Sequence, residues 1–231
     1  MIIGFVGFIG AGKDTAADFL VNYYGFRRES FANTLKDAVA AVFEWDRILL
    51  EGRTNQAREW REQVDPWWAE RLNIPHLTPR WILQHWGTEV FRKGFHDDLW
   101  IASLENKMRK TKDDIVISDV RFPNEIAAIH NAKGIVIRVK RGPDPNWFQA
   151  AVDFNKGPNG NAGWAIGKSK LEKNKIHSSE SAWVGGKIDH VLLNDTTIDD
   201  LFKQLEKIVK NQEIDPPAAK EEISYEVAVD N

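Results

Sequence analysis

Residues near the N-terminus have the types and spacing of a phosphate-binding loop. Gly7 and Gly12 lie five positions apart and Lys13 follows directly, in the pattern G-x-x-x-x-G-K. Small residues let successive backbone N–H groups converge on phosphate oxygens, and the lysine can bridge the outer phosphates of a nucleotide. An apolar run precedes Gly7 and a helical pattern follows Lys13. This context favours a polyphosphate site over a glycine-rich turn with a surface lysine.

The residue after Lys13 departs from the common form of this motif. Most phosphate-binding loops place a magnesium-ligating serine or threonine there, whereas this chain has Asp14, with Thr15 one position later. This spacing resembles that of small-molecule and nucleotide monophosphate kinases, in which magnesium is held more through water and phosphate. Asp14 either orders metal-bound water or complements the dipole of the helix as an ordinary N-terminal carboxylate.

A second polar group follows another apolar run, at residues 114–118. Asp119 ends this run, and Arg121 and Glu125 follow within six residues. Ligands of open α/β sheets bind at the carboxyl ends of the strands, so Asp119 is placed to serve magnesium or an acceptor phosphate. Arg121 can clamp a phosphate with two parallel hydrogen bonds. A turn-forming carboxylate and a plain ion pair are the alternatives.

The periodicity predicts an α/β fold with a parallel sheet covered by helices. Strand, helix and strand between residues 114 and 140 form a βαβ crossover, which implies parallel strands. Gly25 is predicted to cap the first helix at its C-terminus, and Asn33 the second at its N-terminus. The predicted strands are 2–7, 114–118, 134–140 and 190–194, and the predicted helices are 16–24, 33–43, 80–91, 96–110, 124–131 and 198–209.

A single domain is predicted over residues 1–210, with two insertions and a tail after it. Residues 44–79 are polar and rich in Trp, with several arginines interleaved among acids, and are predicted as a partly helical insertion. Residues 142–176 are rich in Gly, Asn and Lys with no sustained period, which predicts a mobile lid or a plain surface insertion. Residues 211–231 are predicted as a flexible tail.

Composition excludes several classes of function. Thirty-one Lys and Arg against 34 Asp and Glu give a net charge of −3, so nucleic acid and membrane surfaces are not expected partners. The chain has no cysteine, which excludes disulfide scaffolds, Cys-ligated zinc and thiol nucleophiles and favours a cytoplasmic location. No protein-ligated metal cluster is expected.

Several segments in a fixed order resemble the tailed-phage deoxynucleoside monophosphate kinases of the P-loop kinase superfamily. They are Gly12–Phe19, Leu35–Ala38, Leu83–Glu89 with Trp100 downstream, Asp119–Arg121 with Glu125, His177–Glu180, and Asn194–Thr197. The resemblance implies a P-loop kinase fold that uses ATP and Mg²⁺ to phosphorylate a small-molecule deoxynucleoside monophosphate. It also implies a location in the host cytoplasm, if the chain is phage-encoded, and a homodimer.

The resemblance also assigns site residues. Those implied for the donor nucleotide are Gly7, Gly10, Ala11, Gly12, Lys13, Asp14, Thr15, Asn194 and Asp195. Those implied for the acceptor are Lys36, Arg80, Gly87, Thr88, Trp100, Asp119, Arg121 and Glu125. Lys13, Asp119 and Arg121 are expected to act directly in transfer. Packed core is the alternative for Trp100, and an ordinary turn is the alternative for Asn194 and Asp195.

Two departures limit this assignment, and two rival functions stay open. Arg80 is followed by Trp81 where family members often have two basic residues, and the 143–175 segment is longer than in smaller relatives. His177 and Glu180 match a family pattern without an assigned role, and helix capping by Ser178 is the plain alternative. The rivals are a kinase of another small acceptor, of the dephospho-coenzyme A or phosphomevalonate type, and a nucleotide-binding ATPase or switch.

Overall fold

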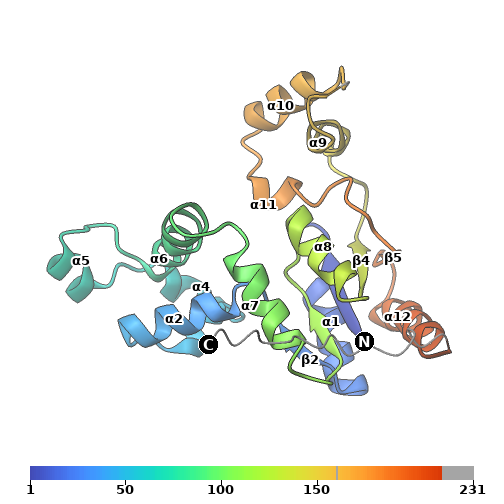
Figure 1. Cartoon of the computed structure of the whole chain (residues 1–231), viewed down its shortest axis with the longest axis horizontal. Coiled ribbons are helices and arrows are strands. Elements are labelled where there is room, and N and C mark those ends of the chain that lie inside the picture. Colours follow the sequence, from blue (N-terminus) through green and yellow to red (C-terminus); the bar gives the residue numbers. More distant parts are fainter. Residues whose placement is uncertain (160, 215–231) are drawn as a thin grey trace, which may run out of the picture.

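The protein is built on a five-stranded parallel sheet with the strand order β2-β3-β1-β4-β5. The computed structural model describes residues 1–159 and 161–214 (Figure 1). The strands are β1 (Ile2–Val6), β2 (Arg27–Glu29), β3 (Ile115–Ile117), β4 (Ile135–Lys140) and β5 (His190–Leu193). The prediction of a parallel sheet covered by helices is confirmed.

The central strand β1 determines where the functional segments lie. It pairs with β3 on one side, with Gly4 opposite Ile117, and with β4 on the other, with Val6 opposite Arg138. Because all strands run the same way, the loop after Val6 and the segment after Ile117 emerge at one edge of the sheet. This is the edge at which open α/β sheets bind ligands.

Helices cover both faces of the sheet, as expected for buried parallel strands. Helices α1 (Lys13–Tyr24) and α12 (Ile198–Ile214) pack on one face, where Leu20 and Leu201 meet Phe5. Helices α7 (Leu99–Met108) and α8 (Pro123–Asn131) pack on the other. Burial of these apolar side chains, at about 25 cal/mol per Å² of apolar surface, is the main force that holds the layers together.

A group of short helices extends to one side of the sheet and has a hydrophobic core of its own (Figure 1). Leu50, Leu77 and Ile82 are buried there together with Trp45 and Trp100. The helices are α2 (Asn33–Phe43), α3 (Arg47–Glu51), α4 (Asn55–Glu62), α5 (Pro66–Leu72), α6 (Pro79–Gln84) and the π-helix η1 (His85–Lys93). The predicted helix 80–91 is therefore an α-helix that widens into a π-helix at His85.

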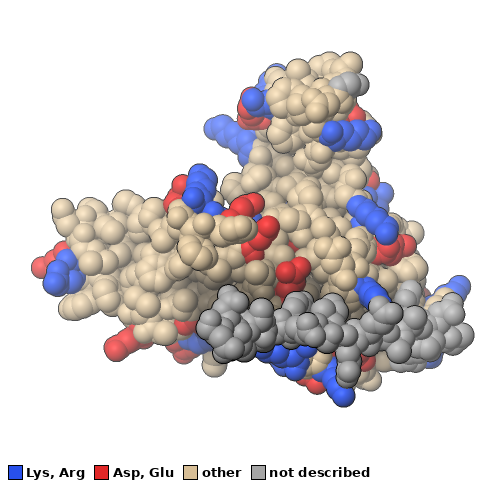
Figure 2. All heavy atoms as spheres, viewed as in Figure 1, with Lys and Arg blue, Asp and Glu red and all other residues tan. Residues whose placement is uncertain are grey.

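Residues 142–176, which show no sustained period in the sequence, contain two helices that the sequence did not predict. Helices α9 (Phe148–Asn155) and α10 (Trp164–Lys173) form a hairpin that projects from the body, with Lys and Arg on its surface (Figure 2). The two helix backbones lie so close together that a Cβ atom at Gly167 would be 2.5 Å from the carbonyl oxygen of Ala150. Short helix α11 (Ser178–Ser181) follows and leads back to the sheet.

Two predicted caps have different outcomes. Gly25 ends α1 in the left-handed conformation, with φ of 69°, as predicted. Asn33 is not the N-cap of α2: Ala32 holds that position, and the Asn33 side chain donates instead to Glu29 at 3.1 Å.

Two further predictions concern the C-terminus and membranes. Helix α12 extends to Ile214, beyond the predicted end at Val209, and the rest of the predicted tail lies outside the described residues. No helix in the described part of the chain is long and apolar enough to cross a membrane.

Candidate nucleotide-binding site

The phosphate loop joins the end of β1 to the start of α1, as its sequence predicts. Gly7 and Gly12 have φ of 143° and 103°, values that side chains rarely adopt. A Cβ atom at Gly7 would overlap the carbonyl oxygen of Val139, so the loop lies directly against β4. No side chain caps the N-terminus of α1. The helix dipole and its first amides are therefore available for an anion.

Lys13 folds back onto this loop. Its ammonium donates hydrogen bonds to the carbonyl oxygens of Gly7 at 2.8 Å and Phe8 at 2.9 Å. Burial lowers the pKa of Lys13, and the nearby Arg121 adds to that effect, while Asp14, Glu180 and Asp119 oppose it. The charges of Arg121 and Asp119 thus act on Lys13.

Asp14 forms an ion pair with an arginine on β2, a strand that the sequence did not predict. Arg28 on β2 forms ion pairs with Asp14 and Asp18 and donates to the hydroxyl of Ser118 at 2.7 Å. Ser118 in turn donates to Asp14 at 3.1 Å. This arrangement joins the start of α1 to β2 and β3, and it gives Asp14 a structural role.

Asp119 has one paired and one free carboxylate oxygen. Ser30 donates to its Oδ2 atom, whereas Oδ1 is buried and has no hydrogen-bond partner among the described residues. An unpaired buried carboxylate oxygen at the ligand edge fits Mg²⁺, which prefers oxygen ligands and keeps several waters. The described residues contain no group of three or more His, Cys, Asp or Glu that could hold a metal by themselves. A magnesium ion would therefore need phosphate and water ligands as well.

Glu125 lies beside Asp119 but is engaged by the backbone. It accepts from the N–H groups of Arg121 at 2.7 Å and Phe122 at 3.2 Å, which caps the start of α8, and Arg92 pairs with it at 3.3 Å. Burial and the neighbouring Asp119 raise the pKa of Glu125 to about 7, although these hydrogen bonds and Arg92 act against the shift. The side chain of Arg121 has no partner among the described residues and stays exposed.

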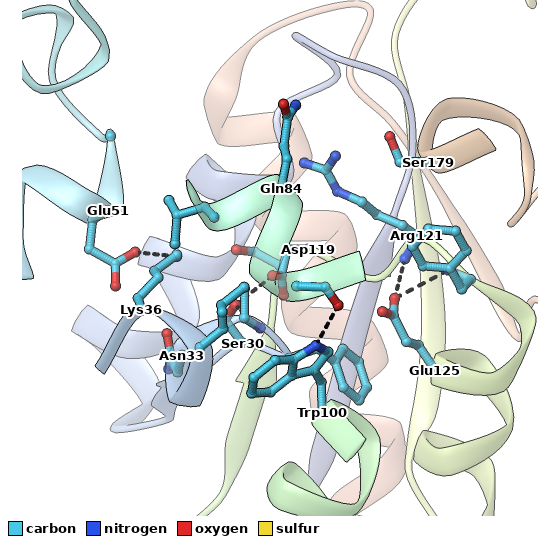
Figure 3. A pocket seen from close by; sticks show the side chains of 18 of the residues that line it. Ser30, Asn33, Lys36, Glu51, Gln84, Trp100, Asp119, Arg121, Glu125 and Ser179 are labelled. Atoms are coloured by element: carbon cyan, nitrogen blue, oxygen red, sulfur yellow. Dashed lines mark hydrogen bonds and ion pairs between the residues drawn. The ribbon is translucent and has the colours of Figure 1, made fainter. Parts of the chain in front are cut away.

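A large open cavity connects these residues to the helical insertion (Figure 3). Its volume is about 1460 Å³, enough for a nucleotide. Gly87, Thr88 and Trp100 line it, together with Lys36. Trp100 is buried, and its indole N–H donates to the carbonyl oxygen of Gly87 at 3.0 Å, so its packing fixes the backbone that borders the cavity.

Two predicted acceptor cations have carboxylate partners. Lys36 pairs with Glu51 at 2.8 Å inside the cavity. Arg80 pairs with Glu62 at 3.0 Å and is not among the residues that line the cavity, so the structure does not bring it to the site.

The structure also adds cations that sequence reasoning did not assign to the site. They are Arg28, Arg47, Arg53, Arg58, Arg61, Arg92 and Lys93. For those in the insertion the sequence signal was a series of arginines among acids, which had no motif to distinguish it from a charged surface.

Residues after β5 lie against the phosphate loop. The Asn194 side chain donates to the carbonyl oxygen of Ala11 at 2.9 Å, and Asp195 accepts from the N–H of Gly142. A smaller cavity of about 110 Å³ lies between residues 8–11 of the loop and residues 139–141. Asn194 and Asp195 thus connect the loop to the exit of β4.

His177 caps α11, a role for which the sequence suggested Ser178. Its Nδ1 atom accepts from the backbone N–H of Ser179 at 3.2 Å. His177, Ser178 and Ser179 line the large cavity, as Arg121 does (Figure 3).

Comparisons with known proteins find two viral relatives. A protein of Acanthamoeba polyphaga mimivirus named a deoxynucleotide monophosphate kinase is 29% identical over 225 residues, covering 91% of this chain and 97% of the relative. The chain is a homologue of viral deoxynucleotide monophosphate kinases. The deoxynucleoside-5'-monophosphate kinase of Escherichia phage T5 is 25% identical over 174 residues, covering 54% of this chain and 70% of that protein. No family model matches the chain.

Solved structures resemble the chain less closely. Shikimate kinase from Aquifex aeolicus covers 93% of this chain, and 99% of its own chain is matched, with a TM-score of 0.45 and 12% identity. Dephospho-CoA kinase from Campylobacter jejuni covers 91% of this chain, and 96% of its own chain is matched, with a TM-score of 0.38 and 15% identity.

Proposed function

We propose that this protein transfers the γ-phosphoryl group of ATP to a deoxynucleoside 5′-monophosphate, giving the diphosphate and ADP. One observation carries the proposal: Asp14, which directly follows Lys13 of the phosphate loop, lines the same cavity as Arg121, Gly87 and Trp100. A donor site and a site large enough for a second nucleotide thus lie side by side. The names of the viral homologues support this acceptor class.

The residues contribute by positioning and by charge. The loop amides and the open N-terminus of α1 bind the donor phosphates, and Lys13 exchanges its two carbonyl partners for phosphate oxygens. Arg121, whose guanidinium is free, stabilises the negative charge that passes between donor and acceptor. The acceptor phosphate is ionised at neutral pH, so no general base is needed.

Magnesium fits the site through Asp119, whose buried Oδ1 atom has no hydrogen-bond partner among the described residues. When bound, the ion neutralises charge on the phosphates of ATP. Asp14 already pairs with Arg28, so its contribution is to orient the start of α1.

The other site residues form the walls. Gly87, Thr88 and Trp100 with Lys36 and Glu125 form the acceptor side, and Asn194 and Asp195 form the donor side. Arg80 is left out, because it pairs with Glu62 outside the cavity. The α9–α10 hairpin serves as a lid that excludes water during transfer.

The proposed organisation is a kinase domain over residues 1–210, with the insertion at 44–79 and the lid at 142–176. The enzyme would act in a cytoplasm, where its nucleotide substrates are found, and the homodimer is a prediction that analytical ultracentrifugation can test.

A coupled assay of ADP release tests the function, with dTMP, dGMP, dCMP and dAMP each offered to the enzyme with ATP and magnesium. We expect ADP release to depend on at least one of these monophosphates. ADP release at the same rate with and without all four monophosphates would favour an ATPase or switch. ADP release that appears only with dephospho-coenzyme A or phosphomevalonate would favour the rival kinases.

A further inference from the structure

The cationic side chains that line the large cavity fall into two groups. Five of the nine already have a carboxylate partner within ion-pair distance: Arg28, Lys36, Arg47, Arg92 and Lys93. Within the described part of the chain, Arg53, Arg58, Arg61 and Arg121 have none. An anion that enters the cavity therefore meets free guanidinium groups at Arg121 and at a cluster of three arginines on the insertion.

Arg61 is the most buried member of this cluster. Its guanidinium packs on the backbone of Gly52, where a Cβ atom would overlap it, and Gly52 has φ of 65°, which favours glycine. The Nη1 atom makes one long hydrogen bond, 3.5 Å, to the carbonyl oxygen of Leu50. The Nε atom is buried and has no partner among the described residues. A buried donor without a partner is costly, so a ligand that accepts from it is stabilised.

The surroundings of Arg61 concentrate positive charge. Burial lowers the pKa of Arg61, and repulsion by Arg80 and Arg58 lowers it further, against the opposing effects of Glu62 and Glu51. Arg58 donates only to the carbonyl oxygens of Gly52 and Arg53 and to the side chain of Asn55, all of them uncharged. The cluster thus retains a positive charge that an incoming dianion would neutralise.

We propose that Arg61, supported by Arg53 and Arg58, binds the 5′-phosphate of the acceptor nucleotide from the side of the insertion. Glu51, next to Gly52, lies across the cavity from Arg121 in Figure 3. A phosphate monoester that lies in the cavity between Gly52 and Arg121 is attracted by Arg61 on one side and by Arg121 on the other. The forked N–H groups of Arg61 match two phosphate oxygens. Arg61 thus provides the contact that Arg80, paired with Glu62, does not.

This inference rests on the proposed function, so the experiment measures binding separately from catalysis. Calorimetry records the affinity of the wild type and of Arg61→Gln for each of the four deoxynucleoside monophosphates, for thymidine, for inorganic phosphate and for ATP. Arg71→Gln is the matched control, because Arg71 lies exposed on α5 and does not line the cavity. Arg61→Lys keeps the positive charge but loses the paired N–H groups of the guanidinium. Thermal unfolding of each variant shows whether it folds.

We expect Arg61→Gln to weaken monophosphate binding about 10-fold to 100-fold, the usual effect of a lost hydrogen bond to a charged group. Arg61→Lys should lose less, and affinities for thymidine and ATP should stay within about twofold of the wild type. In the coupled assay, the KM of the monophosphate should rise more than kcat falls.

Three outcomes would overturn the inference. Unchanged monophosphate binding in folded Arg61→Gln rejects it and leaves the kinase function intact. Weaker binding of ATP or inorganic phosphate alone would assign the cluster to another anion. If the wild type binds none of the monophosphates, the proposed function itself fails, and that result is visible before any variant is made.

Discussion

The ammonium of Lys13 lies 2.8 Å from the carbonyl oxygen of Gly7, six residues earlier in the same loop. This hydrogen bond ties the side chain of Lys13 to the backbone of its own loop. A nucleotide must replace this hydrogen bond and the similar one to Phe8, so the loop exchanges an internal contact for an external one of higher charge.

Lys13→Ala should therefore abolish transfer while the fold survives. The lysine contributes charge to the transferring group rather than core packing, and its loss should lower kcat by about 10³-fold or more. Steady-state ADP release measures kcat, and circular dichroism checks the fold. Transfer within tenfold of the wild type, in a folded variant, would reject the assignment of the loop.

Arg121→Ala should impair use of the monophosphate more than binding of ATP. The guanidinium is exposed in the shared cavity without a partner among the described residues, so its removal leaves no buried charge behind. The KM of the acceptor should rise, while ATP affinity without acceptor, measured by calorimetry, should change little. A collapse in ATP affinity with an unchanged acceptor KM would place Arg121 on the donor side instead.

Glu125→Gln should become more stable relative to the wild type as the pH rises from 5 to 8. Burial raises the pKa of Glu125 to about 7 from its ordinary value of 4.5. The unfolded chain therefore loses this proton at lower pH than the folded protein, and the wild type loses stability across that window. The variant does not lose this free energy of unfolding, which amounts to something on the order of 3 kcal/mol.

Urea unfolding of both proteins at pH 5 and pH 8 measures this difference. Asp153→Asn, at a carboxylate outside the large cavity, is the control for a general loss of charge. Parallel pH profiles for wild type and Glu125→Gln would show that Glu125 is already ionised in the folded protein at pH 5.

Trp100→Phe should destabilise the protein by about 1 to 3 kcal/mol. Phenylalanine keeps the aromatic contact with Phe91 but leaves the buried carbonyl oxygen of Gly87 without its donor. Thermal unfolding provides the measurement, and Trp67→Phe, on the exposed side of α5, should be neutral. Equal effects of the two substitutions would mean that the hydrogen bond to Gly87 contributes nothing.

The α9–α10 hairpin should show helical protection even without ligands. Amides of α9 and α10 should exchange slowly in the free protein, because the two helices pack closely at Gly167. Adding ATP, magnesium and a deoxynucleoside monophosphate together should slow exchange further at the base of the hairpin, around residues 142–147 and 174–178. Hydrogen exchange that is the same with and without these ligands would reject the lid.

The sequence predicts the parts of the site that follow strands with clear patterns. The phosphate loop and Asp119 lie where β1 and β3 end, because an apolar run followed by glycine or by a carboxylate is a local signal. Strand β2 has no such signal: it is three residues long, and two of them are arginines. Arg28 therefore could not be placed beside Asp14 before the sheet was known.

Tertiary contacts decide the remaining differences. The hairpin helices bury few apolar residues, such as Ala150, Ala151 and Leu171, so their periodicity is weak in a segment rich in glycine. Arg61 and Arg80 are the same residue type in similarly polar surroundings. Only the placement of Gly52 and Glu62 shows which of the two faces the cavity.

The strand order has a consequence for the growing chain during translation. Strands β1 and β2 are made first, yet they are not neighbours, because β3 lies between them. A nascent chain that stops before Ile115 therefore holds two strands that cannot complete a native ladder together. Ser118 directly follows β3, so the hydrogen bond from Arg28 to Ser118 can form only after about half of the chain has been made.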